Sequence, residues 1–113
     1  MTTTLFRPAS KKELDLIEKL GWARFPPRLP EQPIFYPVTN LEYARQITVD
    51  WNVPAYGNGY VTKFDVNSAY LKKYTIENVG DPIHNELWVP AEDLEAFNDN
   101  IVGLIEVVES YSK

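Results

Sequence analysis

Tyr60-Val61-Thr62-Lys63-Phe64-Asp65-Val66 alternates apolar and polar residues, which is the pattern of a β-strand with one buried face. Tyr60, Phe64 and Val66 are therefore predicted to point into the core. Tyr56-Gly57-Asn58-Gly59 comes directly before this stretch and has the composition of a turn. The middle of the chain thus predicts a half-buried strand that follows a tight turn.

Further strands and helices can be placed on both sides of this strand. The same patterns predict about six strands, at residues 4–7, 34–38, 60–66, 74–79, 84–89 and 101–108. About three helices are predicted, at residues 11–20, at 41–50 and in a segment that starts at Pro90, with one helical turn at 67–71. Because no regular helical crossovers link the strands, we expect an α+β domain with mostly antiparallel pairing, in one sheet or a split sheet.

Two helix starts match the capping-box pattern, at Ser10–Glu13 and at Thr39–Glu42. In each, the hydroxyl of the first residue and the carboxylate of the last are expected to bind amides of the first helical turn. Gly21 is placed to end the first helix, and Pro54 is expected to follow the end of the second. Thr39 is accordingly interpreted first as a helix cap.

Residues 25–33 contain four prolines, which excludes a helix or a central strand and favours an extended segment. A domain boundary here would leave an N-terminal piece too small to bury a core. We therefore expect a surface loop that wraps a single domain, 1–113, with a docking ligand for another protein as the less favoured alternative.

Composition narrows the classes of function. The 113 residues carry a net charge of −5 and their eleven Lys and Arg residues are scattered, so no nucleic-acid partner is expected. The chain shows neither a signal-peptide pattern nor an apolar run of membrane-helix length, which predicts a cytoplasmic protein without a membrane partner. With no cysteine and a single histidine, no metal site is predicted.

Three residues are candidates for chemistry. His84 and Glu86 stand two apart on a predicted strand, so both side chains are expected on the same face, where they could meet one substrate. The alternative is that both face solvent. Arg7 follows two apolar residues of the first strand and could bind a phosphate or carboxylate with its guanidinium fork. Its alternative is a surface ion pair.

The middle of the chain is rich in aromatic residues, which could line a pocket for a flat ring but are more often core residues. The residues concerned are Tyr36, Tyr43, Trp51, Tyr56 and Tyr60.

The order of these elements resembles a compact ADP-ribosyltransferase-like domain. Nearly the whole chain also resembles a family of short bacterial proteins labelled "ADP-ribosylation/crystallin J1". The segments that carry the resemblance are Leu5–Pro8, Phe35–Asn40, Tyr60–Val66, Glu86–Pro90 and Ile101–Val107.

The resemblance implies NAD as the substrate, held between a basic residue of the first strand and a glutamate of a later strand. Arg7 would contact the pyrophosphate or ribose, and Glu86 would bind a ribose hydroxyl and stabilise the charge that develops as nicotinamide leaves. Tyr36 or Tyr43 would stack on the nicotinamide.

Two positions differ from the family pattern. The resemblance implies that Thr39 contacts NAD and that His84 acts beside the catalytic Glu86. Thr39 stands within the segment that corresponds to a Ser-Thr-Ser stretch in arginine-led transferases, and His84 replaces the Glu or Gln that precedes their catalytic glutamate.

Two hypotheses follow for the function. The first is ADP-ribosyl transfer or NAD hydrolysis, which requires Arg7 and Glu86 to share a concave site. The second is a non-catalytic binding or regulatory module of the same fold with a protein partner. A module would leave these two residues apart or fill the cleft with Trp88 and Tyr36. An exposed apolar patch built from Trp22, Phe25 and the proline-rich segment would favour it.

Overall fold

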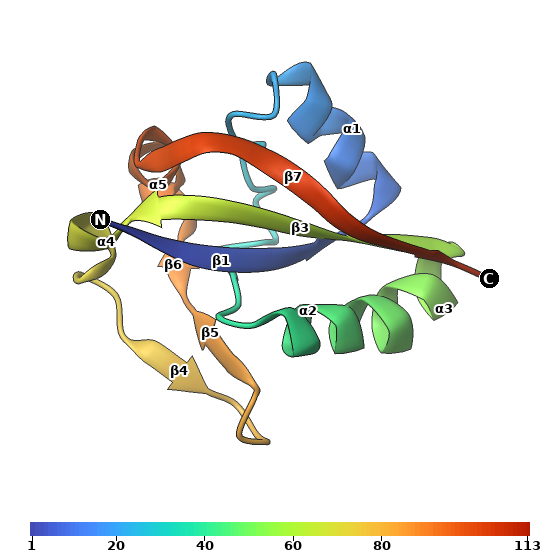
Figure 1. The fold of residues 1–113 in the computed structure, drawn as a ribbon. Helices are drawn as coiled ribbons and strands as arrows, with labels where there is room; N and C mark the ends of the chain where they lie inside the picture. Colours follow the sequence, from blue (N-terminus) through green and yellow to red (C-terminus); the bar gives the residue numbers. More distant parts are fainter.

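Three antiparallel strands form the centre of the computed structural model, which describes residues 1–113 (Figure 1). The central strand β3 (Asn58–Asn67) lies between β1 (Thr2–Ala9) and β7 (Ile101–Ser112). In the ladder between β1 and β3, Leu5 lies opposite Phe64. The radius of gyration is 13.3 Å, as expected for one domain of this length.

The other elements surround this sheet. β2 pairs with β6 and β4 with β5, in both cases antiparallel. The remaining bounds are α1 (Lys11–Lys19), β2 (Ile34–Phe35), α2 (Leu41–Ile47), π-helical turn η1 (Thr48–Asn52), α3 (Val53–Tyr56), α4 (Ser68–Leu71), β4 (Ile76–Asn78), β5 (Asn85–Leu87), β6 (Val89–Pro90), 3-10 turn η2 (Ala91–Asp93) and α5 (Leu94–Asp99). The predicted α+β fold with antiparallel strands is confirmed. None of the helices is long and apolar enough to cross a membrane.

One residue, Val38, joins the central sheet to the β4–β5 pair. Its backbone exchanges two hydrogen bonds with Phe6 of β1, with N···O distances of 2.8 and 2.9 Å. On its other side, Val38 forms an antiparallel bridge with Glu86. The sheet therefore narrows to a single residue between β1 and β5, and this narrow join brings Glu86 close to the first strand.

Both faces of β3 are covered. Phe64 and Val66 are buried in the main core, whereas Val61 points to the other face and is buried against α2. Figure 1 shows α1 on one side of the sheet and α2 with α3 on the other. Tyr60, which was predicted to be a core residue, is only half-buried, because it lies near the start of β3 and outside the main core.

Helix α1 begins and ends where the sequence predicts. The Ser10 hydroxyl accepts a hydrogen bond from the Glu13 backbone N–H at 3.2 Å, and Gly21 follows the helix with a left-handed φ of 72°. The expectation for the Glu13 carboxylate was wrong. It binds Arg7, whose guanidinium is only slightly exposed and offers a two-pronged donor for both carboxylate oxygens.

The second helical segment is longer than predicted. Residues 41–56 are helical without a break, because η1 inserts a π-helical turn between α2 and α3. Pro54 was expected beyond the helix but is the second residue of α3, directly after the π-helical turn. Gly57, with a φ of 84°, ends the run instead. The extension leaves Trp51 and Tyr56 exposed, so the preference for core positions was wrong for both.

Asn40, and not Thr39, caps α2. The Asn40 side-chain oxygen accepts a hydrogen bond from the Tyr43 backbone N–H at 2.7 Å. Because α2 begins at Leu41, the capping position falls on Asn40, and Thr39 precedes it, with its backbone N–H bound to the carbonyl oxygen of Asn85 at 3.1 Å.

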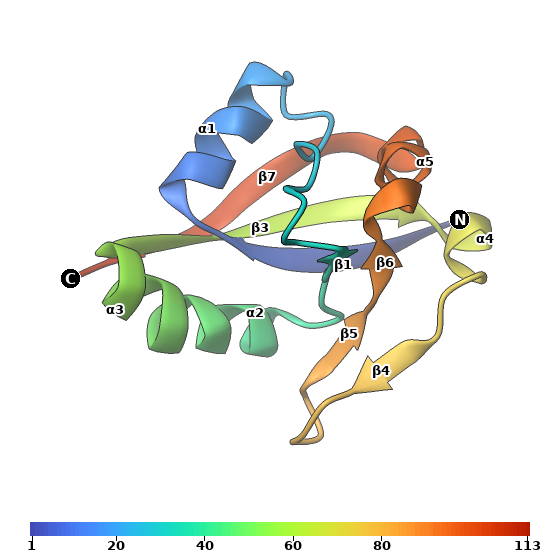
Figure 2. The same ribbon diagram turned by 180° about the vertical axis from the view of Figure 1, so that it is seen from behind.

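The proline-rich segment wraps the domain, as predicted (Figure 2). Phe25 at its start is 1% exposed and its ring packs between those of Phe35 and Phe64. The buried Asn98 amide accepts a hydrogen bond from the Phe25 N–H at 2.9 Å and donates one to its carbonyl at 3.0 Å. The segment is thus anchored to α5 at its start.

Candidate functional site

Three of the predicted site residues, Arg7, Tyr36 and Glu86, line one pocket. This cavity, called the Glu86 pocket below, has a volume of about 460 Å³. Its lining comes from β1, from the segment before α2, from α2 and η1, and from β5 and the residue after it, and consists of Arg7, Pro8, Tyr36, Val38, Ile47, Asn52, Glu86 and Trp88. The narrow join at Val38 explains why residues so far apart in sequence meet here.

Two donors fix the Glu86 carboxylate. The Tyr43 hydroxyl donates to Oε2 at 3.0 Å and the Trp88 indole N–H donates to Oε1 at 2.7 Å. Each carboxylate oxygen keeps a further lone pair for a ligand. Burial, reinforced by the hydrogen bond and charge of Glu86, raises the pKa of Tyr43 to about 12. Tyr43 therefore stays a neutral donor across the neutral pH range.

Arg7 is held on three sides. Its Nε and Nη2 donate to Glu13 at 2.6 and 2.8 Å, and the guanidinium carbon lies 4.6 Å from the centre of the Phe35 ring. Nη1 reaches the Tyr36 carbonyl only at 3.5 Å. Because a guanidinium has five N–H groups, both terminal nitrogens keep a donor for a ligand. Arg7 thus forms the ion pair of the alternative hypothesis, but its side chain is only 12% exposed and also lines the Glu86 pocket.

Aromatic side chains stand beside the carboxylate. Tyr36 and Trp88 meet edge to face, with ring centres 6.4 Å apart, and are 41% and 45% exposed. Tyr36 is therefore not a core residue. Tyr43, by contrast, is buried and does not line the pocket, so it supports Glu86 and does not offer a face to a nicotinamide ring there.

His84 and Thr39 lie outside the Glu86 pocket. The His84 ring stacks on Tyr43 at 4.5 Å and its Nε2 lies 2.7 Å from the Gln46 side-chain oxygen. Thr39 lines a separate cavity of about 300 Å³. His84 therefore packs against the residue that holds Glu86. No group of three or more His, Asp or Glu side chains is arranged to hold a metal ion.

Trp88 is the site residue that sequence reasoning missed as a partner of Glu86. It stands two residues after Glu86, so the same two-residue period that paired His84 with Glu86 places its side chain on that face. The contribution of Tyr43 to the carboxylate had no such local signal, since it depends on the packing of α2 against β5.

Comparison of this chain with models of protein families, with curated proteins and with solved structures finds no match.

Proposed function

We propose that the Glu86 pocket binds the nicotinamide-ribose half of NAD and that the protein consumes NAD, by ADP-ribosyl transfer or by hydrolysis. The observation that carries this proposal is the meeting of Arg7 and Glu86 in one concave pocket with aromatic side chains beside them. The catalytic hypothesis requires Arg7 and Glu86 to share a concave site, whereas a cleft without function would not need both residues in it.

The residues present fit this part of NAD. A volume of about 460 Å³ suits one ring and one sugar, within the range of small-molecule pockets. The exposed rings of Tyr36 and Trp88 offer apolar surface for a flat pyridine ring. The free lone pairs of Glu86 would accept hydrogen bonds from ribose hydroxyls, and the remaining donors of Arg7 would face the phosphates.

Bound NAD supplies a glycosidic bond whose electron pair leaves with the nicotinamide nitrogen, so positive charge develops on the ribose. The Glu86 carboxylate would stabilise this charge, because Tyr43 and Trp88 already hold it in place and it need not reorganise during the reaction. Water or an acceptor hydroxyl would then bond to the sugar carbon in place of nicotinamide, and its proton would pass to solvent. The positive charge of Arg7 would attract the phosphates of NAD and so keep them apart from the Glu86 carboxylate.

A binding module of the same fold is the second candidate. The large exposed fractions of Tyr36 and Trp88 favour it, because exposed aromatic side chains often contact partners. The expected apolar patch of Trp22 and Phe25 does not favour the module, since Phe25 is buried and Trp22 is half-buried against the core.

Nicotinamide release from NAD by the purified protein tests the proposal. Glu86→Gln keeps the shape of the side chain and removes its charge, and we expect release to fall ~100-fold or more. Glu92→Gln, at an exposed position outside the pocket, makes the same change in charge and should leave release unchanged. Equal release by Glu86→Gln and the wild type would contradict catalysis by Glu86, and absence of release from the wild type would favour the module.

A further inference from the structure

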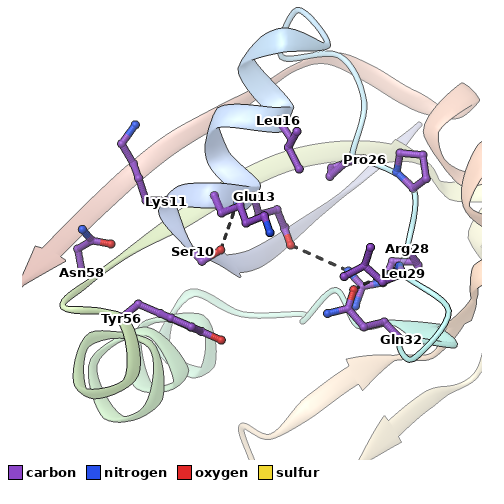
Figure 3. Close-up of a pocket in the computed structure, with 12 residues that line it drawn as sticks. Ser10, Lys11, Glu13, Leu16, Pro26, Arg28, Leu29, Gln32, Tyr56 and Asn58 are labelled. Atoms are coloured by element: carbon purple, nitrogen blue, oxygen red, sulfur yellow. Dashed lines mark hydrogen bonds and ion pairs between the residues drawn. The ribbon is translucent and has the colours of Figure 1, made fainter.

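A second, larger cavity lies between α1 and the proline-rich segment (Figure 3). This Arg28 pocket has a volume of about 550 Å³. It is separate from the Glu86 pocket, but the two linings touch through the ion pair of Arg7 with Glu13. Its lining consists of Ser10, Lys11, Lys12, Glu13, Leu16, Pro26, Pro27, Arg28, Leu29, Gln32, Tyr56 and Asn58.

The fold neutralises the charge of Arg28 only in part. Its side chain is 12% exposed, yet its Nε is buried without a hydrogen-bond partner. The one nearby carboxylate, Glu13, lies 4.0 Å from Nη1 and already accepts two hydrogen bonds from Arg7. Burial, and then the charge of Arg7, lower the pKa of Arg28. The guanidinium groups of Arg7 and Arg28 thus share the Glu13 carboxylate, so the cavity keeps an excess of positive charge.

Other donors line the same cavity. Figure 3 shows Arg28 and Glu13 pointing toward one another from opposite walls, with Gln32 below Arg28. Lys12 also lines the cavity and is exposed without an ion pair, whereas Lys11 binds Asp15. Basic side chains therefore outnumber the single acidic one here, although the whole chain has a net charge of −5.

The cavity also offers apolar surface. Leu29 is 51% exposed and Tyr56 is 65% exposed, and they stand on different walls. A ligand that matched all of these groups would combine a compact anion with an apolar or aromatic body.

We propose that the Arg28 pocket binds the phosphate group of a small molecule whose body packs on Leu29 and Tyr56. A phosphate accepts several hydrogen bonds, which suits the guanidinium of Arg28 together with the ammonium of Lys12 and the amide of Gln32 better than a carboxylate would. Binding would supply the acceptors that Arg28 lacks. This site does not depend on the proposed reaction of NAD.

A purely structural role for Arg28 predicts a different behaviour. If the contact with Glu13 mattered chiefly for folding, Arg28→Met would lower the melting temperature in buffer without phosphate. For a residue kept for a ligand, the variant melts at or above the wild-type temperature, because it removes a buried donor that has no hydrogen-bond partner. Phosphate should then raise the melting temperature of the wild type and leave that of Arg28→Met unchanged.

The direct experiment is an NMR titration of the isotope-labelled protein with inorganic phosphate and with phenyl phosphate, at constant ionic strength. We expect saturable shifts of the amides of residues 10–13 and 28–32, tighter binding of phenyl phosphate, and at least a ~10-fold loss of affinity in Arg28→Met. Arg24→Met is the matched control, because Arg24 binds Glu95 and Asp99 away from the cavity. It should bind as the wild type does.

Three results would overturn the proposal. The first is the absence of saturable shifts with either phosphate, and the second is equal affinity in Arg28→Met and the wild type. The third is equal binding of phenylacetate and phenyl phosphate, which would assign the pocket to carboxylates.

Discussion

Arg7 and Arg28 make a natural pair for comparison. Both guanidiniums lie over the ring of Phe35, at 4.6 and 5.7 Å from its centre, and both side chains are 12% exposed. Both also approach Glu13, but only Arg7 forms hydrogen bonds with it. The two arginines thus share their packing and differ in their polar partners. The charge of Arg7 stabilises the fold, whereas the charge of Arg28 is available to a ligand.

The two pockets differ in the same way. In the Glu86 pocket the key carboxylate has two donors and is fixed before any ligand arrives, whereas in the Arg28 pocket the key cation has no hydrogen bond. Preorganised charge suits catalysis, and a cation without a hydrogen-bond partner suits capture of an anion. Substitutions that remove one of the two arginines at a time test this difference.

The largest effect on stability is expected from Arg7→Met. It leaves the Glu13 carboxylate, 16% exposed, without its two hydrogen bonds. We expect a loss of about 3 kcal/mol in the free energy of unfolding, measured by urea denaturation. Arg24→Met, which removes exposed ion pairs, should lose less than about 1 kcal/mol. An equally small loss in Arg7→Met would mean that Arg28 takes over Glu13, and the distinction between the two arginines would fail.

Asn98→Ala should have the next largest effect. It leaves the N–H and carbonyl of Phe25 without partners in a buried position, which should lower the free energy of unfolding by about 2 kcal/mol. Because Phe25 anchors the segment that carries Arg28, binding of phenyl phosphate should weaken as well. Amide hydrogen exchange at Phe25 should become faster in the variant, and an unchanged rate would show that other contacts hold the segment.

Tyr43→Phe should cost about 1 kcal/mol near neutral pH, by removing the hydroxyl that donates to Glu86. Because the folded-state pKa of Tyr43 is raised from 10.0 to about 12, this stabilisation is complete below pH 10 and is lost as the pH rises toward 12. The difference in unfolding free energy between wild type and variant should therefore shrink above pH 10. Tyrosinate absorbance of the two proteins locates the pKa of Tyr43, and a value near 10 would contradict both the burial of the hydroxyl and its hydrogen bond to Glu86.

The smallest effect on stability is expected from Arg28→Met. The free energy of unfolding should stay within about 0.5 kcal/mol of the wild type or rise. The losses of unfolding free energy in Arg28→Met and Arg7→Met should be compared under the same denaturation conditions. A loss as large as that of Arg7→Met would place both arginines in the fold and remove the argument for a ligand at Arg28.

Local signals made much of the fold predictable. The alternation that buries Phe64 and Val66, the cap at Ser10 and the left-handed Gly21 each depend on residues close together in sequence. The helical run through Pro54 was not predictable in this way, because a π-helical turn has no period that the sequence displays. Its consequence, the exposure of Tyr56, was missed for the same reason.

The site was predictable in part. The resemblance named Arg7, Tyr36 and Glu86, and the structure brings these three together. It also grouped Thr39 with them, but Thr39 lines another cavity, because the chain turns into α2 immediately after the extended segment. The ion pair of Arg7 with Glu13 was hidden by the capping-box pattern, which assigned the same carboxylate to a different partner.

Binding of NAD in the Glu86 pocket can be followed through the indole N–H signals of the three tryptophans. Trp88 donates to Glu86 in the pocket, whereas Trp51 is 72% exposed and lies outside it. During titration with NAD, the Trp88 signal should shift saturably, the Trp51 signal should stay in place, and Glu86→Gln should weaken the response. A Trp88 signal that does not move at millimolar NAD would contradict binding of NAD in this pocket.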